Sequence, residues 1–152
     1  MALASPPGAG SPDLDAEAAL AARLRLVVTR LNRALRQQVA GGLTTSQIST
    51  LATAARLETP TLGELAAAEQ VQPPSVTRMV AALESARMLE RRVDPDDGRV
   101  VRVAVTGEGH RTLQRIRSMR NALLARRLRR LSVEERRQVA DLVPLLERLV
   151  DS

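Results

Sequence analysis

The stretch PPSVTRMVAALESARMLERRVDPDDGRVVRVAV, residues 73–105, decides the fold, because its hydrophobic periodicity changes along its length. Its first part carries Val76, Val80 and Leu83 at spacings of three and four residues, which predicts a helix with one apolar face. Two prolines open this segment, and prolines are tolerated in the first turn of a helix. We therefore predict a helix over residues 73–86 whose apolar face points into a core.

The second part of the same stretch switches to the period of two that is typical of strands. We predict strands over residues 88–93 and 99–105, separated by the turn cluster DPDDG. Val101, Val103 and Val105 fall on one face of the second strand. Because a lone hairpin is only marginally stable in water, this one must pack on the helices that precede it.

Two short helices are predicted ahead of this stretch, and each begins with a capping box. In this motif a Thr or Ser hydroxyl accepts the backbone N–H three residues on, where a Glu or Gln side chain reaches back. The pairs that fit the motif are Thr44 with Gln47, Thr61 with Glu64 and, near the end of the chain, Ser132 with Glu135. Three short helices followed by a hairpin predict a winged helix-turn-helix over residues 44–105.

Long helices are predicted on both sides of this domain. The first spans residues 14–40 and follows a tail, residues 1–13, that we expect to be disordered because it is rich in Ala, Ser, Pro and Gly. A second long helix and a terminal helix fill residues 106–152, and Pro144 is expected to kink or split the terminal one. The first helix carries an apolar stripe of Leu20, Leu24, Val27, Leu31, Leu35 and Val39. So small a body cannot bury such a stripe unless something packs along it.

The predicted helix over residues 73–86 has a solvent face suited to a DNA groove. That face carries Pro74, Ser75, Thr77 and Arg78. Small side chains let a helix enter a major groove, where Arg78 would reach a guanine edge or a phosphate. A helix N-terminus also offers free N–H groups that suit phosphate. The alternative interpretation is an ordinary solvated helix face.

The turn of the hairpin offers a second contact. Arg99 lies just past the turn and would enter a minor groove, where negative potential is concentrated. Asp97 is placed to hold that guanidinium in position. Arg91, Arg92 and Arg102 are candidates for phosphate contacts. The alternatives are a plain surface charge for Arg99 and ordinary turn chemistry for Asp97.

The composition narrows the class of protein. The chain has 152 residues, which suits one domain, and a formal net charge of +6, which favours an anionic partner and nucleic acid before membrane. All 23 basic residues are arginine, a bias that a GC-rich genome also produces. Without cysteine a disulfide or thiol switch is impossible, and with His110 as the one histidine we expect no metal site.

Other classes of protein find little support. An enzyme would need a nucleophile–base pair or a metal cluster, and the acidic residues cluster in turns and caps. No apolar run approaches the roughly 20 residues that cross a bilayer, and the start of the chain has no secretory pattern, so we expect a cytoplasmic protein.

Residues 111–137 hold ten Arg against two Glu. We interpret that segment as a solvated face with dimer salt bridges and general attraction to DNA, the alternative being a membrane-surface helix.

The chain resembles the MarR family of winged-helix regulators from about residue 20 to about residue 150. The matching stretch is LTTSQISTLATAARLETPTLGELAAAEQVQPPSVTRMVAALESARMLERRVDPDDGRVVRVAVTGEG, residues 43–109. The resemblance implies that PPSVTRMVAALE is the recognition helix and that DPDDGR is the wing, whose Asp-x-Arg pair Asp97 and Arg99 match. Gly98 is a departure, because many members carry a second wing Arg there.

The resemblance implies a mainly α fold with a small two-stranded β-wing, plus a helical dimerisation region formed by residues 14–40 and 106–152. It implies a homodimer that binds double-stranded DNA at a pseudo-palindromic operator, with half-site centres roughly 34 Å apart. We expect a sequence-specific regulator, a repressor, relieved by a small-molecule effector of unknown identity and needing no cofactor. The alternative is a constitutive architectural or nucleoid-associated protein with little sequence selectivity.

Overall fold

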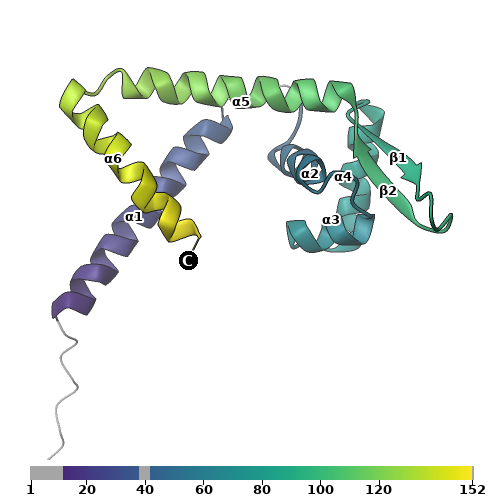
Figure 1. The fold of residues 1–152 in the computed structure, drawn as a ribbon, viewed down its shortest axis with the longest axis horizontal. Helices are drawn as coiled ribbons and strands as arrows, with labels where there is room; N and C mark the ends of the chain where they lie inside the picture. Colours follow the sequence, from purple (N-terminus) through teal and green to yellow (C-terminus); the bar gives the residue numbers. More distant parts are fainter. Residues whose placement is uncertain (1–11, 38–41, 152) are drawn as a thin grey trace, which may run out of the picture. The chain divides into compact units, whose positions relative to one another are not determined.

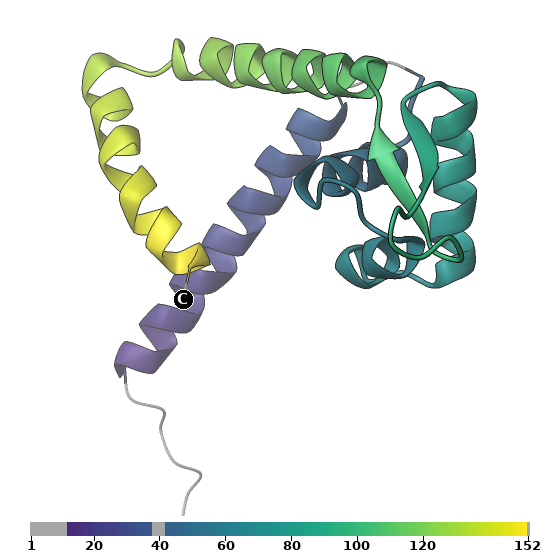
Figure 2. The same ribbon diagram turned by 45° about the vertical axis from the view of Figure 1, so that its right-hand side comes forward.

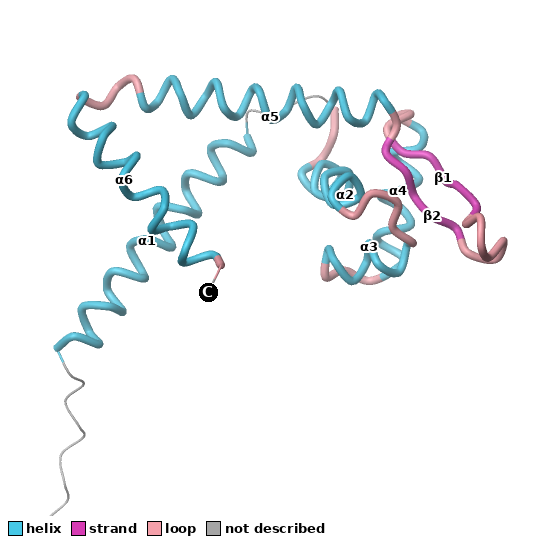
Figure 3. Tube along the Cα trace, viewed as in Figure 1, coloured by secondary structure: helices cyan, strands magenta, loops and turns pink. Residues whose placement is uncertain are grey.

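The computed structural model describes residues 12–37 and 42–151, which fold into six helices and one two-stranded sheet (Figure 1, Figure 3). The elements are α1 (Pro12–Gln37), α2 (Thr45–Arg56), α3 (Leu62–Glu69), α4 (Pro73–Ser85), β1 (Leu89–Val93), β2 (Val101–Val105), α5 (Gly107–Leu128) and α6 (Val133–Val150). Their order is the predicted one, and the fold class, mainly α with a two-stranded wing, is confirmed.

The helix α1 belongs to a unit of its own, separate from the unit of residues 38–152. It begins at Pro12, so Pro12 and Asp13 are helical and do not belong to the predicted tail. The rest of that tail, with the expected N-cap Ser11, lies outside the described residues, as does the predicted helix end at residues 38–40. The large apolar residues that α1 exposes are Leu14, Leu20, Leu26, Val27, Val28 and Leu31.

The predicted capping boxes are present at the starts of three helices. At α2 the hydroxyl of Thr44 accepts the N–H of Gln47 at 3.2 Å, and the side-chain oxygen of Gln47 accepts the N–H of Thr44 at 2.8 Å. Thr61 with Glu64 and Ser132 with Glu135 repeat this geometry for α3 and α6. These local hydrogen bonds satisfy N–H groups that have no partner within the helix, and so they define where each helix begins.

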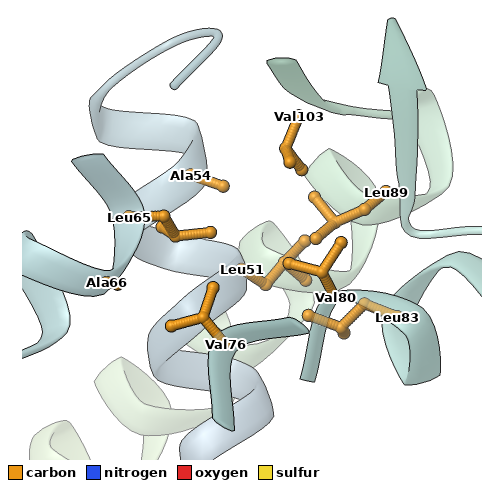
Figure 4. Close-up of a cluster of buried hydrophobic side chains, with 9 residues drawn as sticks. All are labelled: Leu51, Ala54, Leu65, Ala66, Val76, Val80, Leu83, Leu89 and Val103. Carbon is orange, nitrogen blue, oxygen red and sulfur yellow. The ribbon is translucent and has the colours of Figure 1, made fainter. Parts of the chain in front are cut away.

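One core holds the helix-turn-helix and the hairpin together (Figure 4). Its members are Leu51, Ala54, Leu65, Ala66, Val76, Val80, Leu83, Leu89 and Val103, drawn from α2, α3, α4, β1 and β2. Val76, Val80 and Leu83 are fully buried, which confirms the predicted inner face of α4. Because α4 is buried along this stripe, its opposite face is held toward solvent.

The hairpin pairs β1 with β2 in antiparallel register, from Leu89 opposite Val105 to Val93 opposite Val101. The second strand is shorter than predicted, since Arg99 lies in the turn before it. On its outer edge, the N–H of Val103 donates to the carbonyl of Pro60 at 2.8 Å. The sheet is therefore attached to the loop between α2 and α3, as well as to the core below it.

The start of α5 is packed tightly against the start of the hairpin. The hydroxyl of Thr106 accepts the N–H of Gly109 at 3.1 Å and donates to the carbonyl of Arg87 at 2.6 Å. A Cβ atom placed on Gly109 would lie 2.3 Å from the carbonyl oxygen of Met88 and 2.7 Å from a methyl carbon of Val105. No side chain fits there unless the backbone moves, so the junction between wing and α5 requires glycine.

Gly109→Ala is therefore expected to lower the free energy of unfolding by about 1–3 kcal/mol, the usual cost of overpacking a core. Gly107→Ala is the matched control in the same helical turn, because its Cβ would meet nothing closer than an Arg111 side-chain nitrogen at 3.6 Å. Urea unfolding followed by circular dichroism measures both variants. Equal stability of the two would contradict the close approach at Gly109.

The terminal helix α6 runs through Pro144 without interruption, so the expectation that this residue splits the helix is wrong. Proline removes one backbone donor, and its partner would have been the carbonyl of Ala140. Because every described residue of α6 is exposed, water can satisfy that carbonyl. The helix thus keeps its apolar residues on a continuous rod.

Candidate nucleic-acid interface

The recognition candidate α4 presents a face of small side chains and one arginine. Pro74, Thr77 and Arg78 are exposed as predicted, while Ser75 is half-buried. Figure 2 shows the hairpin beside α4 at one end of α5, and α4 contacts β1. The helix and the wing therefore belong to one body and lie next to each other.

The N-terminus of α4 offers fewer backbone donors than the sequence led us to expect. Pro73 and Pro74 have no N–H, and the N–H of Ser75 already donates to the carbonyl of Gln72 at 2.9 Å. The expectation that free N–H groups there bind phosphate is therefore wrong. Any contact between α4 and a nucleic acid must therefore be made by its side chains.

Among these side chains, Arg78 is the available donor. The hydroxyl of Thr77 donates to the carbonyl of Pro73 at 3.0 Å, so only its acceptor capacity is left for a ligand. Arg78 is exposed and makes no hydrogen bond or ion pair within residues 12–37 and 42–151. Among the described residues, the five N–H groups of this guanidinium thus have no partner.

At the tip of the wing, Asp97 and Arg99 lie together, as predicted. One Asp97 carboxylate oxygen accepts the backbone N–H of Arg99 at 3.0 Å and its Nε at 3.4 Å. The Arg99 side chain is 94% exposed, so its remaining N–H groups point to solvent. Asp97 therefore holds the Nε side of the Arg99 guanidinium, while its two Nη groups stay free to bind a ligand.

At the root of the wing, the structure shows a network that the sequence did not reveal. Asp94 is buried and its carboxylate accepts the N–H groups of Asp96 at 2.8 Å and Asp97 at 3.1 Å. The same carboxylate pairs with the Nε of Arg102, whose Nη1 donates to the carbonyl of Thr59 at 3.0 Å. Arg102 is thus engaged within the protein, which makes it a weaker candidate for a phosphate contact than Arg91 and Arg92.

The other two candidate phosphate contacts also have acidic neighbours. Arg91 pairs with Glu84 at 3.1 Å, and Arg92 pairs with Glu90. Both arginines are largely exposed, and exposed pairs are weak. They can exchange these carboxylates for phosphate, so they stay candidates.

The electrostatics of the wing root favour the charged forms of both partners. The hydrogen bond from Arg102 lowers the pKa of the Asp94 carboxyl below its usual range, and the N–H groups of Asp96 and Asp97 lower that pKa further. The bond to Asp94 raises the pKa of Arg102. Both shifts therefore favour the charged pair.

Acid is expected to loosen the wing. A carboxyl whose pKa is lowered by folding stabilises the folded state above its unfolded pKa, and it loses this effect as the pH falls through its folded pKa. The stabilisation should therefore begin to fall below the ordinary Asp pKa of about 3.9, and the contacts of Asp94 should open as the pH falls through its lowered folded-state pKa. Amide NMR of Asp96 and Asp97, titrated from neutral pH to well below that ordinary pKa, measures this opening. In Asp94→Asn the acid step should be absent, and an unchanged profile would contradict the assignment.

A hollow of about 500 Å³ lies between α2 and α5. Its lining is Ser49, Ala52, Thr53, Ala55, Arg56, Leu113 and Arg117. The hydroxyls of Ser49 and Thr53 are hydrogen-bonded to Glu69. Arg56 and Arg117 are exposed, without hydrogen-bond or ion-pair partners in the described part of the chain. The hollow therefore combines an aliphatic surface with two available cations.

Two further features of the described residues bear on metal binding and on membrane crossing. Within residues 12–37 and 42–151, no group of His, Asp and Glu side chains is arranged to hold a metal ion. In the same residues, no helix combines the length and the apolar character that crossing a membrane requires.

Comparison with known proteins points to one family. The model of the MarR family matches residues 43–101, from the start of the helix-turn-helix to the wing. The chain is 39% identical over 139 residues to a Mycobacterium bovis protein described as an uncharacterized HTH-type transcriptional regulator, covering 91% of this chain and 97% of that protein. A Mycobacterium tuberculosis protein described as an HTH-type transcriptional regulator gives the same values.

Solved structures agree with these sequence relatives. A Pseudomonas aeruginosa protein described as a transcriptional regulator superposes with a TM-score of 0.79 at 33% identity, covering 95% of this chain and 99% of that one. A mutant of MarR from E. coli superposes with a TM-score of 0.72 at 25% identity, covering 86% of this chain and 96% of that one. The similarity thus extends beyond the residues that the family model matches.

Proposed function

Because the chain belongs to the MarR family, we propose that it is a homodimeric regulator that binds specific DNA sequences. In this proposal α4 enters the major groove and the wing enters the minor groove. The observation that carries it is the placement of Arg78 and Arg99, which belong to one compact unit and are both exposed to solvent. Bidentate arginine is the commonest reader of guanine edges, and a narrow minor groove attracts arginine.

The chain is a DNA-binding transcriptional regulator and not an enzyme, since its family and its relatives are transcriptional regulators. The contacts in the major groove come from the exposed face of α4, namely Pro74, Ser75, Thr77 and Arg78. Arg99, held by Asp97, supplies the contact in the minor groove. Because the proposed target is chromosomal DNA, we expect the protein in the cytoplasm.

Arg78→Ala and Arg99→Ala should each weaken binding to the operator by about 1–3 kcal/mol, because each removes a charged donor to a base edge or a phosphate. Mobility-shift titration at fixed salt, with the upstream region of the gene itself, measures the loss. Arg115→Ala is the matched control: it removes the same charge from α5, where Arg115 donates to the hydroxyl of Thr112. Unchanged affinity of both test variants would contradict the assignment of the interface.

The same titration separates the regulator from the architectural alternative. A regulator binds its operator at least about a thousandfold more tightly than random duplex, whereas a coating protein shows a ratio near one. Both lose affinity steeply with salt, so the salt concentration must be equal in the two measurements. A ratio near one would favour the architectural protein.

The apolar face of α6 supports the proposed homodimer. Val139, Leu142, Val143, Leu146 and Leu149 are all exposed, and none of the described residues of α6 is buried. Soluble proteins rarely leave so large an apolar surface in water. A second copy of the chain that presents the same face would cover it, and a two-fold axis would match a pseudo-palindromic operator.

We place the proposed effector in the hollow between α2 and α5. Arg56 and Arg117 would bind its negative charge, and Ala52, Ala55 and Leu113 would contact an apolar body. A small organic anion has both properties. Binding there would relieve repression if it changed the angle between α5 and the helix-turn-helix, because the two recognition helices of a dimer must match the spacing of the grooves.

A further inference from the structure

One guanidinium joins the wing to the body of the DNA-binding domain. Arg102 pairs through its Nε with the carboxylate of Asp94, at the root of the wing. Its Nη1 donates to the carbonyl of Thr59 at 3.0 Å, in the loop between α2 and α3, and lies 3.9 Å from the Glu64 carboxylate of the α3 capping box. We call Thr59, Asp94 and Arg102 the wing clamp.

The register of the hairpin favours this clamp. Arg92 lies directly opposite Arg102 across the two strands, and like charges in that position repel each other. Glu90 neutralises Arg92, and Asp94 neutralises Arg102. The two arginines differ in where their partners lie. Arg92 pairs with Glu90 on its own strand, whereas Arg102 also donates to the carbonyl of Thr59, 43 residues earlier in the chain.

A continuous set of contacts leads from the clamp to the tip of the wing. The Asp94 carboxylate accepts the N–H of Asp97, and the Asp97 carboxylate accepts the N–H and Nε of Arg99. Each step involves a charged acceptor, and such hydrogen bonds are roughly twice as strong as neutral ones. The place of Arg99 relative to the helical body thus depends on the partner of Asp94.

We propose that Arg102 is a positioning residue, which fixes the wing against the α2–α3 loop and so sets where Arg99 is presented to the minor groove. It binds no phosphate itself. The inference rests on the proposed function, because it assumes that Arg99 contacts DNA. The clamp itself can be tested without DNA, so its failure can be told apart from a failure of the proposed function.

The first experiment measures the clamp in the free full-length protein. Arg102→Met removes the guanidinium and keeps an unbranched apolar stem. Amide hydrogen exchange at Asp96 and Asp97 should become about tenfold faster, since local opening releases their acceptor. Arg92→Met is the matched control, with the same charge removed from the facing position, and should leave that exchange unchanged. Equal exchange in wild type and Arg102→Met would overturn the proposal.

The second experiment measures how Arg102 acts on DNA binding. Arg102→Met alone should weaken operator binding about tenfold, and in the Arg99→Ala background its effect should shrink to within about twofold, because residues that act through one another are not additive. Combined with Arg78→Ala, the two effects should multiply. Arg102→Lys keeps the charge but lacks the planar fork, so it should restore binding only in part.

The dependence of affinity on salt tests whether Arg102 contacts phosphate directly. In the Arg99→Ala background, removal of a phosphate contact lowers the slope of log affinity against log salt by about one, whereas removal of a residue that acts only through Arg99 leaves the slope unchanged. A lower slope on adding Arg102→Met to Arg99→Ala, or an undiminished effect on affinity in that background, would overturn the proposal. If the wild type failed to bind DNA, the proposed function would fall, and hydrogen exchange alone would decide the clamp.

Discussion

Replacing Leu51 by alanine should lower the free energy of unfolding by about 2–5 kcal/mol, the largest single loss that we expect in this chain. Leu51 is 0% exposed and lies at the centre of the core in Figure 4, among Val76, Val80 and Leu83 of α4. Truncation leaves a cavity where α2 supports α4. Because a small domain has only about 5–15 kcal/mol of stability, a loss of this size removes a large part of it.

Urea unfolding at neutral pH measures this loss, and Val93→Ala serves as its control. Val93 is an exposed aliphatic residue of the same domain, and its truncation should cost less than about 1 kcal/mol. DNA binding by Leu51→Ala should recover when the folded state is favoured, for example by low temperature near the stability maximum. A loss of binding without any loss of stability would contradict the role of Leu51 as support for α4.

Introducing Asp at both Leu142 and Leu146 should weaken the dimer at least about a hundredfold, because a carboxylate without a partner is costly to bury. Both leucines lie on the exposed face of α6 that we assign to the partner copy. Analytical ultracentrifugation over a range of concentrations measures the dissociation. Operator affinity should fall along with dimer formation, since a monomer contacts only one half-site.

Ala140→Asp is the control for this experiment, because it adds a carboxylate to α6 at an exposed residue that does not share a face with Leu142 and Leu146. It should leave both the dimer and DNA binding intact. A double variant that stays dimeric would show that the apolar face of α6 is not the interface. The interface would then have to be sought on the other exposed apolar helix, α1.

Much of the fold could be predicted because its signals are local. The capping boxes at Thr44, Thr61 and Ser132 begin their helices at the expected residues. The inner face of α4 follows from spacing alone. The pairing of Asp97 with Arg99 also lies within a single turn, so a carboxylate two residues before an arginine was enough to expect it.

The expectations that the structure changed all depend on contacts between residues that the sequence does not place side by side, or on how exposed a helix is. Arg102 looked like a phosphate contact because its sequence neighbours show nothing of Thr59, 43 residues earlier. The N–H of Ser75 looked free until its bond to Gln72 was seen. Of the two expectations for Pro144, a kink or a split, the split is wrong, because the exposed setting of α6 lets the helix continue. One signal for the wing clamp did exist, namely an acidic residue at the strand end and an arginine across the hairpin.

The amino-acid sequence by itself determined the order of the elements, their starts and their apolar faces, because caps and periodicity act between residues a few positions apart. It also placed Arg78 on the solvent face of α4 and Arg99 at the turn of the hairpin, and both are exposed. Only the tertiary structure decided which arginines are available to a ligand, because Asp94 and Thr59 reach Arg102 through space, and the chain must fold before those distances exist.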